Sequence, residues 1–514
     1  MRTSAIVLRL FAAMTTLPVL LNVLAHQQSV LERPVHADPA PLPVPNPTKS
    51  FWIDSAPDAN PLAKHGSDGP LTHDADICIV GSGITGVSAA YHISRLLADQ
   101  PPSDSPLKVV ILEARDFCSG ATGRNGGHLT PAAIHDFVHH AGQHGTDDAI
   151  RAVDLEHHTV ADIVNILSNA NKEKETDLVQ GGHITLLFTQ PEIEQAKADY
   201  EAAAAAGIDV SDVHFLTRDE VQKTYGAAYP GVRIPGHNIW PLKLVTHLFH
   251  LARSTGANSS TSQLTLHTST PVTSITPSDS AGESPSGRRW NLTTPRGPIA
   301  CSYVLHATNA YASHLLPHLR GPAGIIPTRG QIIALRAAAP AAEITRTGWG
   351  GNEGFEYWFP RPVANPNASD PEESESPLVI LGGGRESATG YELYNVDDAS
   401  VSAGVGETLR RFLPAVFPGK YEEGREPEME WTGIMGFTKT GDPFVGPVLD
   451  PATGQPDSFK GQYISAGYSG HGMPRAYGCA EAVAGMIVAD IQGKEWSVPD
   501  WLPRHFLTKE HVEE

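Results

Sequence analysis

One short stretch near residue 80 restricts the fold more than any other part of the chain. Residues 76–80 (DICIV) form an apolar run suited to a fully buried strand, and residues 81–86 (GSGITG) follow directly. Residues 87–98 then place apolar side chains at helical spacing, and residues 107–113 supply a second apolar run that ends in Glu113. This order of strand, glycine turn, helix and strand predicts one βαβ unit.

The glycine turn predicts a dinucleotide-binding site. Gly81 permits the tight bend, Gly83 lets the backbone approach a pyrophosphate, and Gly86 allows close packing of helix on strand. The helix start directs unpaired amides at the phosphates. Glu113 is expected to accept hydrogen bonds from a ribose hydroxyl. It lies 113 − 86 = 27 residues past Gly86, compared with a usual figure of about 20, and a Pro-rich loop at 98–106 accounts for the surplus.

Two further segments favour a flavin dinucleotide over a nicotinamide one. Residues 114–128 (ARDFCSGATGRNGGH) are dense in glycine and small side chains, which suits backbone lying against a flat ligand. A second glycine cluster at 464–473 (ISAGYSGHGM) precedes a helix expected from about 474 to 490. Two glycine turns at opposite ends of the chain suit a long, extended cofactor. The sequence therefore predicts that the protein binds FAD.

These segments resemble the D-amino-acid-oxidase-type FAD-dependent oxidoreductases, the group that includes glycine, sarcosine and γ-glutamylputrescine oxidases. The resemblance covers about residues 74–490. The GATGRNGGH and GYSGHGM stretches are most similar to the γ-glutamylputrescine oxidase branch. The most specific parts of the overall resemblance are residues 76–86, 119–128, 307–311 (ATNAY), 438–446 (TKTGDPFVG) and 467–473.

The resemblance implies an α/β, two-lobed fold. A Rossmann-type FAD-binding domain would combine residues 74–181, 237–314 and 431–492. A mixed-sheet substrate domain, built from 182–236 and 315–430, would be interleaved with it, and 493–514 would form a C-terminal tail. FAD would contact a set of residues spread over five segments, namely Gly81, Ser82, Gly83, Gly86, Glu113, Ala114, Arg115, Gly123, Arg124, Asn125, Gly126, Val272, Ala307, Thr308, Gly470, His471, Gly472 and Met473.

The family chemistry removes a hydride from a carbon next to an amine nitrogen and passes it to flavin N5, after which the imine hydrolyses. Four residues are candidates for catalytic roles: His471, His128, Tyr357 and Arg329. His471 and His128 would polarise flavin or substrate, Tyr357 would belong to an aromatic wall that holds an ammonium group, and Arg329 would pair a substrate carboxylate. Each has an ordinary structural alternative, as a core, strand or surface side chain.

Covalent attachment of the flavin is not expected. Where monomeric sarcosine oxidases place a linking cysteine, this chain has Met435, and where dimethylglycine-type dehydrogenases place a linking histidine, it has Arg124. His128 is close enough in sequence to keep a covalent link open.

The N-terminal segment differs from the rest. Residues 1–25 carry Arg2 and Arg9 before an apolar run that is short for a membrane span, which favours a secretory signal peptide. A mitochondrial presequence and a retained membrane anchor remain alternatives. Residues 26–73 are Pro-rich and predict a linker or a surface-hugging arm. Sequons at Asn258, Asn291 and Asn367, in loop-like segments, are consistent with a secreted glycoprotein.

The net charge and the spacing of histidines and cysteines argue against nucleic acid, metal ions and a disulfide framework. The net charge of −20 disfavours nucleic acid. No histidine pair at metal-ligand spacing has a supporting cysteine or carboxylate nearby in sequence, so no metal is predicted. The four cysteines are too few for a disulfide framework, and Cys78 and Cys301 are expected to be buried free thiols.

Three functions remain open at this stage. The first is an amine or amino-acid oxidase that uses O₂ and releases H₂O₂. The second is a dehydrogenase that passes electrons to another acceptor, and the third is a flavin-binding protein without turnover. An enzyme that acts on a non-amine substrate is the remaining alternative. The sequence does not identify the substrate or the oligomeric state.

Overall fold

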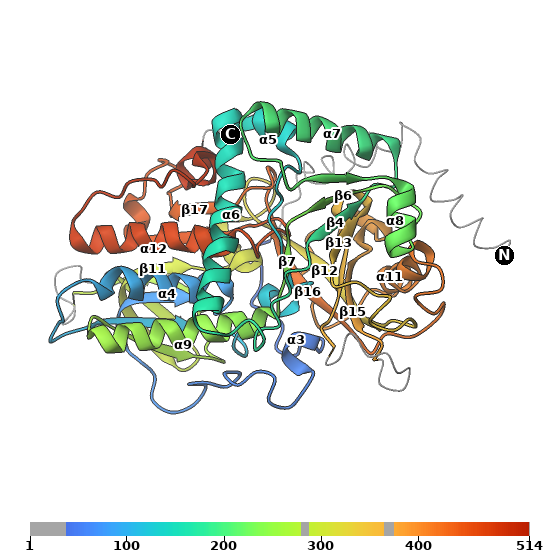
Figure 1. The fold of residues 1–514 in the computed structure, drawn as a ribbon. Coiled ribbons are helices and arrows are strands. Elements are labelled where there is room, and N and C mark those ends of the chain that lie inside the picture. The colour runs from blue at the N-terminus through green and yellow to red at the C-terminus, as the bar shows by residue number, and fades with distance from the viewer. Residues whose placement is uncertain (1–37, 279–286, 364–374, 513–514) are drawn as a thin grey trace.

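The computed structural model describes residues 38–278, 287–363 and 375–512, and these form two lobes that lie side by side (Figure 1). The predicted leader at 1–25, the first part of the predicted arm and the sequon at Asn367 lie outside the described residues.

The first lobe is built on the predicted βαβ unit. In spatial order the main strands of its sheet are β17 (Phe444–Pro447), β18 (Gln462–Ala466), β11 (Gly297–His306), β1 (Asp74–Val80), β2 (Leu107–Leu112) and β8 (Ser262–His267). The five strands from β18 to β8 run parallel, and β17 closes one edge in the antiparallel direction. Strands β9 (Ser274–Pro277) and β10 (Trp290–Thr294) extend antiparallel from β11.

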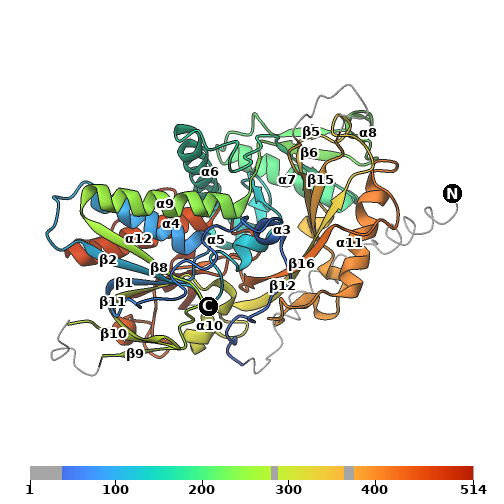
Figure 2. The ribbon, with the colours of Figure 1, turned by 90° about the horizontal axis from the view of Figure 1, so that it is seen from below.

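The second half of strand β1, residues 77–80, is apolar because both faces of the strand are covered there. Ile77 and Ile79 pack into the core formed with helices α4 (Ile84–Ala98), α9 (Pro241–Ser259) and α12 (Ala476–Gln492). Cys78 and Val80 pack on the opposite face against Leu292 of β10. Figure 2 shows the three helices on one side of the sheet and the β9–β10 pair on the other. This two-sided burial is the condition for a parallel sheet.

The second lobe is a mixed sheet. Its pairings are antiparallel except for β13 with β4. The expected domain boundary at residue 431 falls inside β16, which the hydrogen bonds assign to this sheet. In spatial order the strands are β16 (Met429–Phe437), β12 (Ile326–Arg336), β15 (Leu378–Gly383), β14 (Glu356–Pro360), β13 (Gly348–Gly351), β4 (His183–Leu186), β6 (Gly231–Ile234) and β5 (His214–Leu216). The α/β, two-lobed prediction is confirmed.

Further helices surround and connect the sheets. The 24-residue helix α6 (Thr146–Asn169) was not expected from the sequence. It runs beside the junction of the lobes and contacts α5 (Phe137–His144) and α12 (Figure 1). A short pair, β3 (His128–Leu129) with β7 (His237–Asn238), joins the loop after β2 to the start of α9. The remaining helices are α3 (Phe51–Asp54), α5 (Phe137–His144), α6 (Thr146–Asn169), α7 (Gln190–Ala205), α8 (Arg218–Tyr225), α10 (Ala312–Leu315) and α11 (Ala403–Val416).

The described part of the Pro-rich arm packs into the body of the protein. Trp52 of α3 is fully buried against Phe359 of the second sheet and Trp240. Its indole N–H donates to the carbonyl of Asn125 at 2.5 Å. At the other terminus, Leu502 and Phe506 are buried in the core of the first lobe. Both segments are therefore part of the folded structure.

Other details differ from the sequence-based expectation. Asn258 lies in the last turn of α9 and Asn291 lies in β10, so neither sequon sits in a loop, because helix and strand both extend through these polar residues. All four cysteines are buried and free, as expected for Cys78 and Cys301. Among the described residues, no helix is both long and apolar enough to cross a bilayer.

Two fully buried histidines make the stability of the fold depend on pH. Burial lowers the pKa of His92 and of His306 to about 4, and His306 Nε2 lies 2.8 Å from the side-chain oxygen of Gln462. The unfolded chain, where imidazole has a pKa of about 6.5, therefore binds more protons than the folded chain between about pH 6.5 and 4. Stability must fall as the pH falls through this window, by up to about 1.4 kcal/mol per pH unit for each such histidine.

We predict that His306→Gln reduces this slope in urea unfolding measured from pH 7 to pH 4.5. His214→Gln, which removes an imidazole from an exposed strand, is the matched control. An equal effect of the two substitutions would contradict the assignment to burial.

Candidate functional site

A cavity of about 810 Å³ begins at the carboxyl ends of β1 and β2 and extends between the two sheets. Open parallel sheets bind ligands at this edge, and ligand sites commonly have volumes of about 300–1,000 Å³. Its lining includes Val272 and Pro41 of the arm together with Tyr357 and His471. Its volume suits a dinucleotide.

The glycine turn forms the floor of the cavity. Gly81 has φ +111°, and a Cβ there would lie 2.5 Å from the carbonyl oxygen of Ala307, so only glycine fits. The Glu113 carboxylate accepts from the backbone N–H and the hydroxyl of Ser82, at 3.0 and 2.7 Å, and from the backbone N–H of Arg115 at 2.9 Å. Glu113 therefore fixes the turn while it lines the cavity beside it. These features fit a bound dinucleotide.

Most of the residues expected to contact FAD do line this cavity. They are Gly81, Ser82, Gly83, Glu113, Ala114, Arg115, Arg124, Asn125, Gly126, Val272, Ala307, Thr308, Gly470, His471, Gly472 and Met473. Gly86 does not, because it packs α4 on the turn, where a Cβ would lie 2.0 Å from the carbonyl oxygen of Gly81. Gly123 does not either, because it packs against Ile53 of the arm and its carbonyl accepts from Ser50 Oγ at 2.7 Å.

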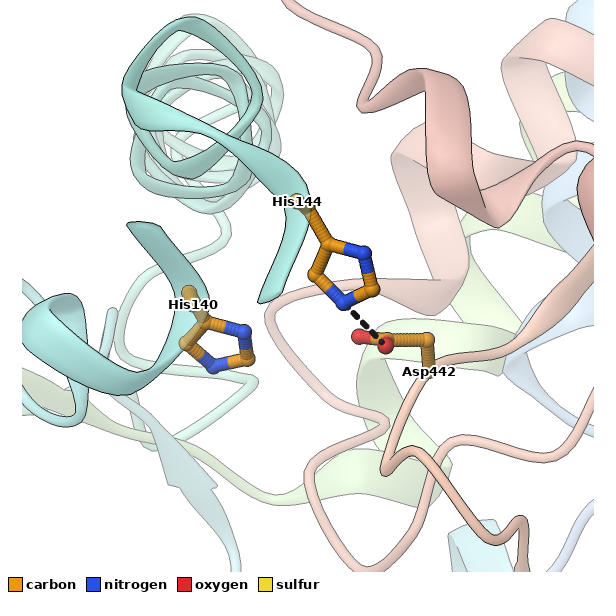
Figure 3. Close-up of side chains that lie close together, drawn as sticks. All are labelled: His140, His144 and Asp442. Atoms are coloured by element: carbon orange, nitrogen blue, oxygen red, sulfur yellow. Dashed lines mark ion pairs between the residues drawn. The ribbon is translucent and has the colours of Figure 1, made fainter. Parts of the chain in front are cut away.

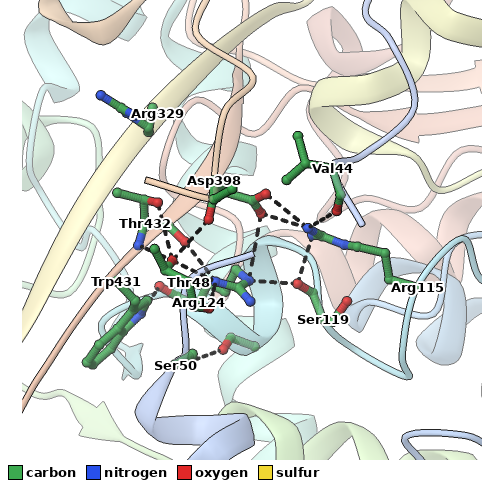
Figure 4. A network of polar contacts seen from close by, with 12 residues as sticks. Val44, Thr48, Ser50, Arg115, Ser119, Arg124, Arg329, Asp398, Trp431 and Thr432 are labelled. Atoms are coloured by element: carbon green, nitrogen blue, oxygen red, sulfur yellow. Dashed lines mark hydrogen bonds and ion pairs between the residues drawn. The ribbon is translucent and has the colours of Figure 1, made fainter. Parts of the chain in front are cut away.

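Asp398 of the second lobe joins the lobes beside the cavity (Figure 4). Its side chain is 1% exposed, and both carboxylate oxygens lie 3.0 Å from Arg115 Nη1. Arg124 Nε lies 3.8 Å from the same carboxylate. Burial lowers the pKa of Arg124 to about 10, which leaves its guanidinium charged at pH 7. Two cations of the first lobe thus surround one anion of the second.

The arm completes this arrangement. Thr48 donates its backbone N–H to the carbonyl of Asp398 at 2.7 Å, and its own carbonyl accepts from Arg124 Nη1 at 2.8 Å. The carbonyl of Val44 accepts from Arg115 Nη1 at 3.2 Å. Arm, first lobe and second lobe therefore meet in one polar network.

Arg329 is not placed to bind a substrate, contrary to its expected role. Its Nε donates to Glu392 at 2.8 Å, and its Nη1 donates to the carbonyl of Asp397 and to Ser400. It does not line the cavity. The guanidinium is held by the loop after β15, a contact between distant segments that the sequence alone does not show.

His128 and Tyr357, two of the proposed catalytic residues, meet in the cavity. Their rings lie edge to face at 5.7 Å, and His183 of β4 lies 5.7 Å from His128. Burial lowers the pKa of His128 to about 4 and of His183 to about 3, and raises that of Tyr357 to about 12. At pH 7 these three side chains are neutral.

His471 is held by a carboxylate that the sequence analysis missed. Glu156 of α6 lies with Oε2 3.0 Å from His471 Nε2, and its Oε1 accepts from Arg475 Nε at 2.7 Å. Burial alone would raise the pKa of Glu156, but His471 and Arg475 hold that pKa well below its usual range. His471 itself is 38% exposed and lines the cavity. No motif marks Glu156, because only the fold brings α6 to the glycine cluster.

Arg385 is a second residue that the sequence analysis missed. It follows β15 and lines the cavity between Phe355 and Phe437, with its guanidinium 4.8 and 5.0 Å from their ring centroids. Among the described residues, no acceptor satisfies its buried Nη1. The only sequence signal is three glycines, 382–384, that end the strand directly before it.

Comparisons with known proteins agree with this geometry. The model of the FAD dependent oxidoreductase family matches residues 76–486. The chain belongs to this family. The resemblance inferred from the sequence is thereby confirmed, and with it the assignment as an FAD-dependent enzyme.

Individual relatives are distant. The chain is 24% identical over 431 residues to the probable oxidoreductase OrdL of Rhizobium meliloti (strain 1021), covering 81% of this chain and 83% of that protein. It is also 24% identical over 240 residues to the gamma-glutamylputrescine oxidoreductase of Escherichia coli (strain K12), covering 46% and 49%.

Solved structures show the same fold. Glycine oxidase from Geobacillus kaustophilus aligns with a TM-score of 0.58 at 21% identity, covering 84% of this chain and 100% of that one. L-Proline dehydrogenase from P. horikoshii aligns with a TM-score of 0.60 at 17% identity, covering 85% and 98%.

We predict that Glu156→Leu lowers the free energy of unfolding by about 3–5 kcal/mol, because it leaves the buried Arg475 without its carboxylate. Glu175→Leu is the control, since it removes a partner of Lys172 at the surface, where an ion pair contributes about 0–1 kcal/mol. Urea unfolding at pH 7 measures both. Similar losses for the two variants would show that the Glu156 contacts do not stabilise the fold.

Proposed function

We propose that the protein oxidises the C–N bond of an amino acid that carries a free carboxylate, with FAD as the oxidant and O₂ as the final acceptor. The single observation that carries this proposal is Arg385, a half-buried cation whose buried Nη1 has no acceptor among the described residues, in the cavity that the dinucleotide turn also lines.

Arg385 suits a carboxylate for an electrostatic reason. Burial lowers the pKa of its guanidinium, and Phe355 and Phe437 enclose it without accepting a strong hydrogen bond. A buried guanidinium N–H without an acceptor is costly, and a planar carboxylate that fits the guanidinium fork supplies that acceptor. A ligand with a carboxylate therefore gains more from this position than an amine without one.

The rest of the wall favours a neutral amine. The imidazoles of His128 and His183 and the hydroxyl of Tyr357 carry no charge at pH 7. Burial and the neighbouring Glu386 raise the pKa of Glu356 well above its usual range. A substrate ammonium group thus meets few full negative charges, and loss of its proton is favoured before oxidation.

FAD, when bound, supplies the oxidising chemistry by accepting a hydride from the carbon next to the nitrogen. The chain binds the carboxylate at Arg385, holds the reacting carbon near the glycine-rich loops and surrounds it with aromatic side chains that exclude water. The imine product then hydrolyses in water to an oxo acid and ammonia or an amine.

The proposed oxidase has two alternatives, a dehydrogenase and a flavin-binding protein without turnover. A glycine oxidase and an L-proline dehydrogenase both have this fold, so the fold accommodates oxidases and dehydrogenases alike. A flavin-binding protein without turnover is the third function. O₂ consumption with stoichiometric H₂O₂ supports the oxidase, and flavin reduction without O₂ uptake would favour the dehydrogenase.

We predict that Arg385→Lys lowers kcat/KM for the best amino acid by about 30-fold or more, the effect of losing about 2–5 kcal/mol from a buried charge pair. The same variant should change kcat/KM only slightly for the matching amine that lacks the carboxylate. Anaerobic bleaching of the flavin with a panel of amino acids and amines measures both.

Arg336→Lys is the matched control, because this arginine lies at the end of a strand in the second sheet and pairs with Glu428 outside the cavity. Equal losses of activity toward the amino acid and the amine in Arg385→Lys would contradict carboxylate binding at this residue. Failure of every amine and amino acid to bleach the flavin would contradict the proposed reaction.

A further inference from the structure

Three side chains from two distant segments gather beside the cavity. His140 and His144 are four residues apart on α5 and therefore share one face of the helix. Asp442 comes from the turn between β16 and β17. One ligand atom of each residue lies within 4.8 Å of the other two. Figure 3 shows the imidazole of His144 directed at the Asp442 carboxylate, with His140 on the preceding turn of the helix.

Asp442 is a buried carboxylate that requires positive charge nearby. Its side chain is 1% exposed, and its Oδ2 lies 3.3 Å from His144 Nε2. Arg475 approaches the same turn through a 3.4 Å contact with the carbonyl of Gly441, but its guanidinium is engaged by Glu156. An anion buried among imidazoles is stable only with a proton on one of them or with a bound cation.

His140 supplies an independent indication. Its Nδ1 is buried, and it has no hydrogen-bond partner among the described residues. A buried ring nitrogen without a partner loses the solvation that water gave it, unless a ligand is bound there. His140 belongs to the same group of three residues as the carboxylate.

A second carboxylate and a third histidine orient the group. His505 Nε2 lies 3.4 Å from Asp442 Oδ1, and its ring stacks on that of His144 at 3.8 Å between centroids. His505 Nδ1 lies 2.5 Å from Asp148, which also accepts the backbone N–H groups of Arg504 and His505. Carboxylate–imidazole contacts of this kind fix ligand side chains around metal ions.

We propose that His140, His144 and Asp442 bind one divalent transition-metal ion, with Zn²⁺ as the best fit. Two imidazoles and one carboxylate suit zinc and its neighbours, whereas Ca²⁺ and Mg²⁺ prefer oxygen ligands throughout. For three atoms that lie within 4.8 Å of one another, some point lies no more than about 2.8 Å from each, so side-chain shifts of at most about 0.7 Å give Zn–N distances near 2.1 Å.

The position of the ion defines its role. It links α5 to the turn that contains Asp442, and through His505 it also secures the C-terminal segment. His140 and Gly441 line the cavity, so the ion holds part of the cavity wall in place and takes no part in the oxidation itself. The sequence alone predicts no metal, because Asp442 is far from the two histidines in sequence and only the fold brings them together.

The FAD-loaded full-length protein, stripped of metal with a chelator, is titrated with Zn²⁺ by calorimetry. We expect one ion per chain and a thermal midpoint that rises with Zn²⁺. His140→Ala and His144→Ala should each weaken binding by about tenfold or more. His139→Ala is the matched control, because it removes an exposed histidine from the same helix and should leave the affinity unchanged.

Titration of the wild-type protein with Co²⁺ provides a readout that does not depend on whether a variant folds. Coordination by imidazole and carboxylate should give saturable visible bands at one equivalent, which Zn²⁺ then displaces. Absence of stoichiometric binding by the wild-type protein would overturn the proposal, and an imidazolium would then neutralise Asp442. Equal affinities in His139→Ala, His140→Ala and His144→Ala would overturn it as well. Neither result depends on the proposed activity.

Discussion

The architecture depends on one buried carboxylate. Asp398 reaches from the second lobe to Arg115 and Arg124 of the first, and the arm adds Val44 and Thr48 to the same network. Removing one member of such a buried group leaves the others uncompensated, which is far more costly than losing a surface ion pair. Because Asp398 itself does not line the cavity, its contribution is to hold together the two walls of that cavity.

The two walls contribute different chemistry. The first lobe supplies backbone: glycine turns, helix starts and one carboxylate, Glu113, which suit phosphates and ribose. The second lobe supplies side chains: the aromatic residues of β14, neutral imidazoles and the cation Arg385. His471 belongs to the first lobe but is oriented by Glu156 of α6. The cavity wall of the first lobe is thus mainly main chain, whereas that of the second lobe is formed by side chains that distant strands bring together.

The sequence predicted the parts of the site that are local. The βαβ unit, the glycine turn and Glu113 follow one another within a few dozen residues, so their physical roles can be inferred from order and spacing. Arg329 was wrongly expected to bind substrate because its partner Glu392 comes from another segment. Glu156, Arg385 and Asp398 were missed for the same reason. Each acquires its role only through contacts between segments that no periodicity or motif connects.

The affinity of FAD for Asp398→Asn, compared with that for the wild-type protein, tests this account most directly. The substitution keeps the size of the side chain and removes the charge that the two arginines share. If the lobes form the FAD site only when they are held together, the dissociation constant should rise by about tenfold or more, the effect of about 1.4 kcal/mol. An unchanged affinity in a folded Asp398→Asn protein would contradict it.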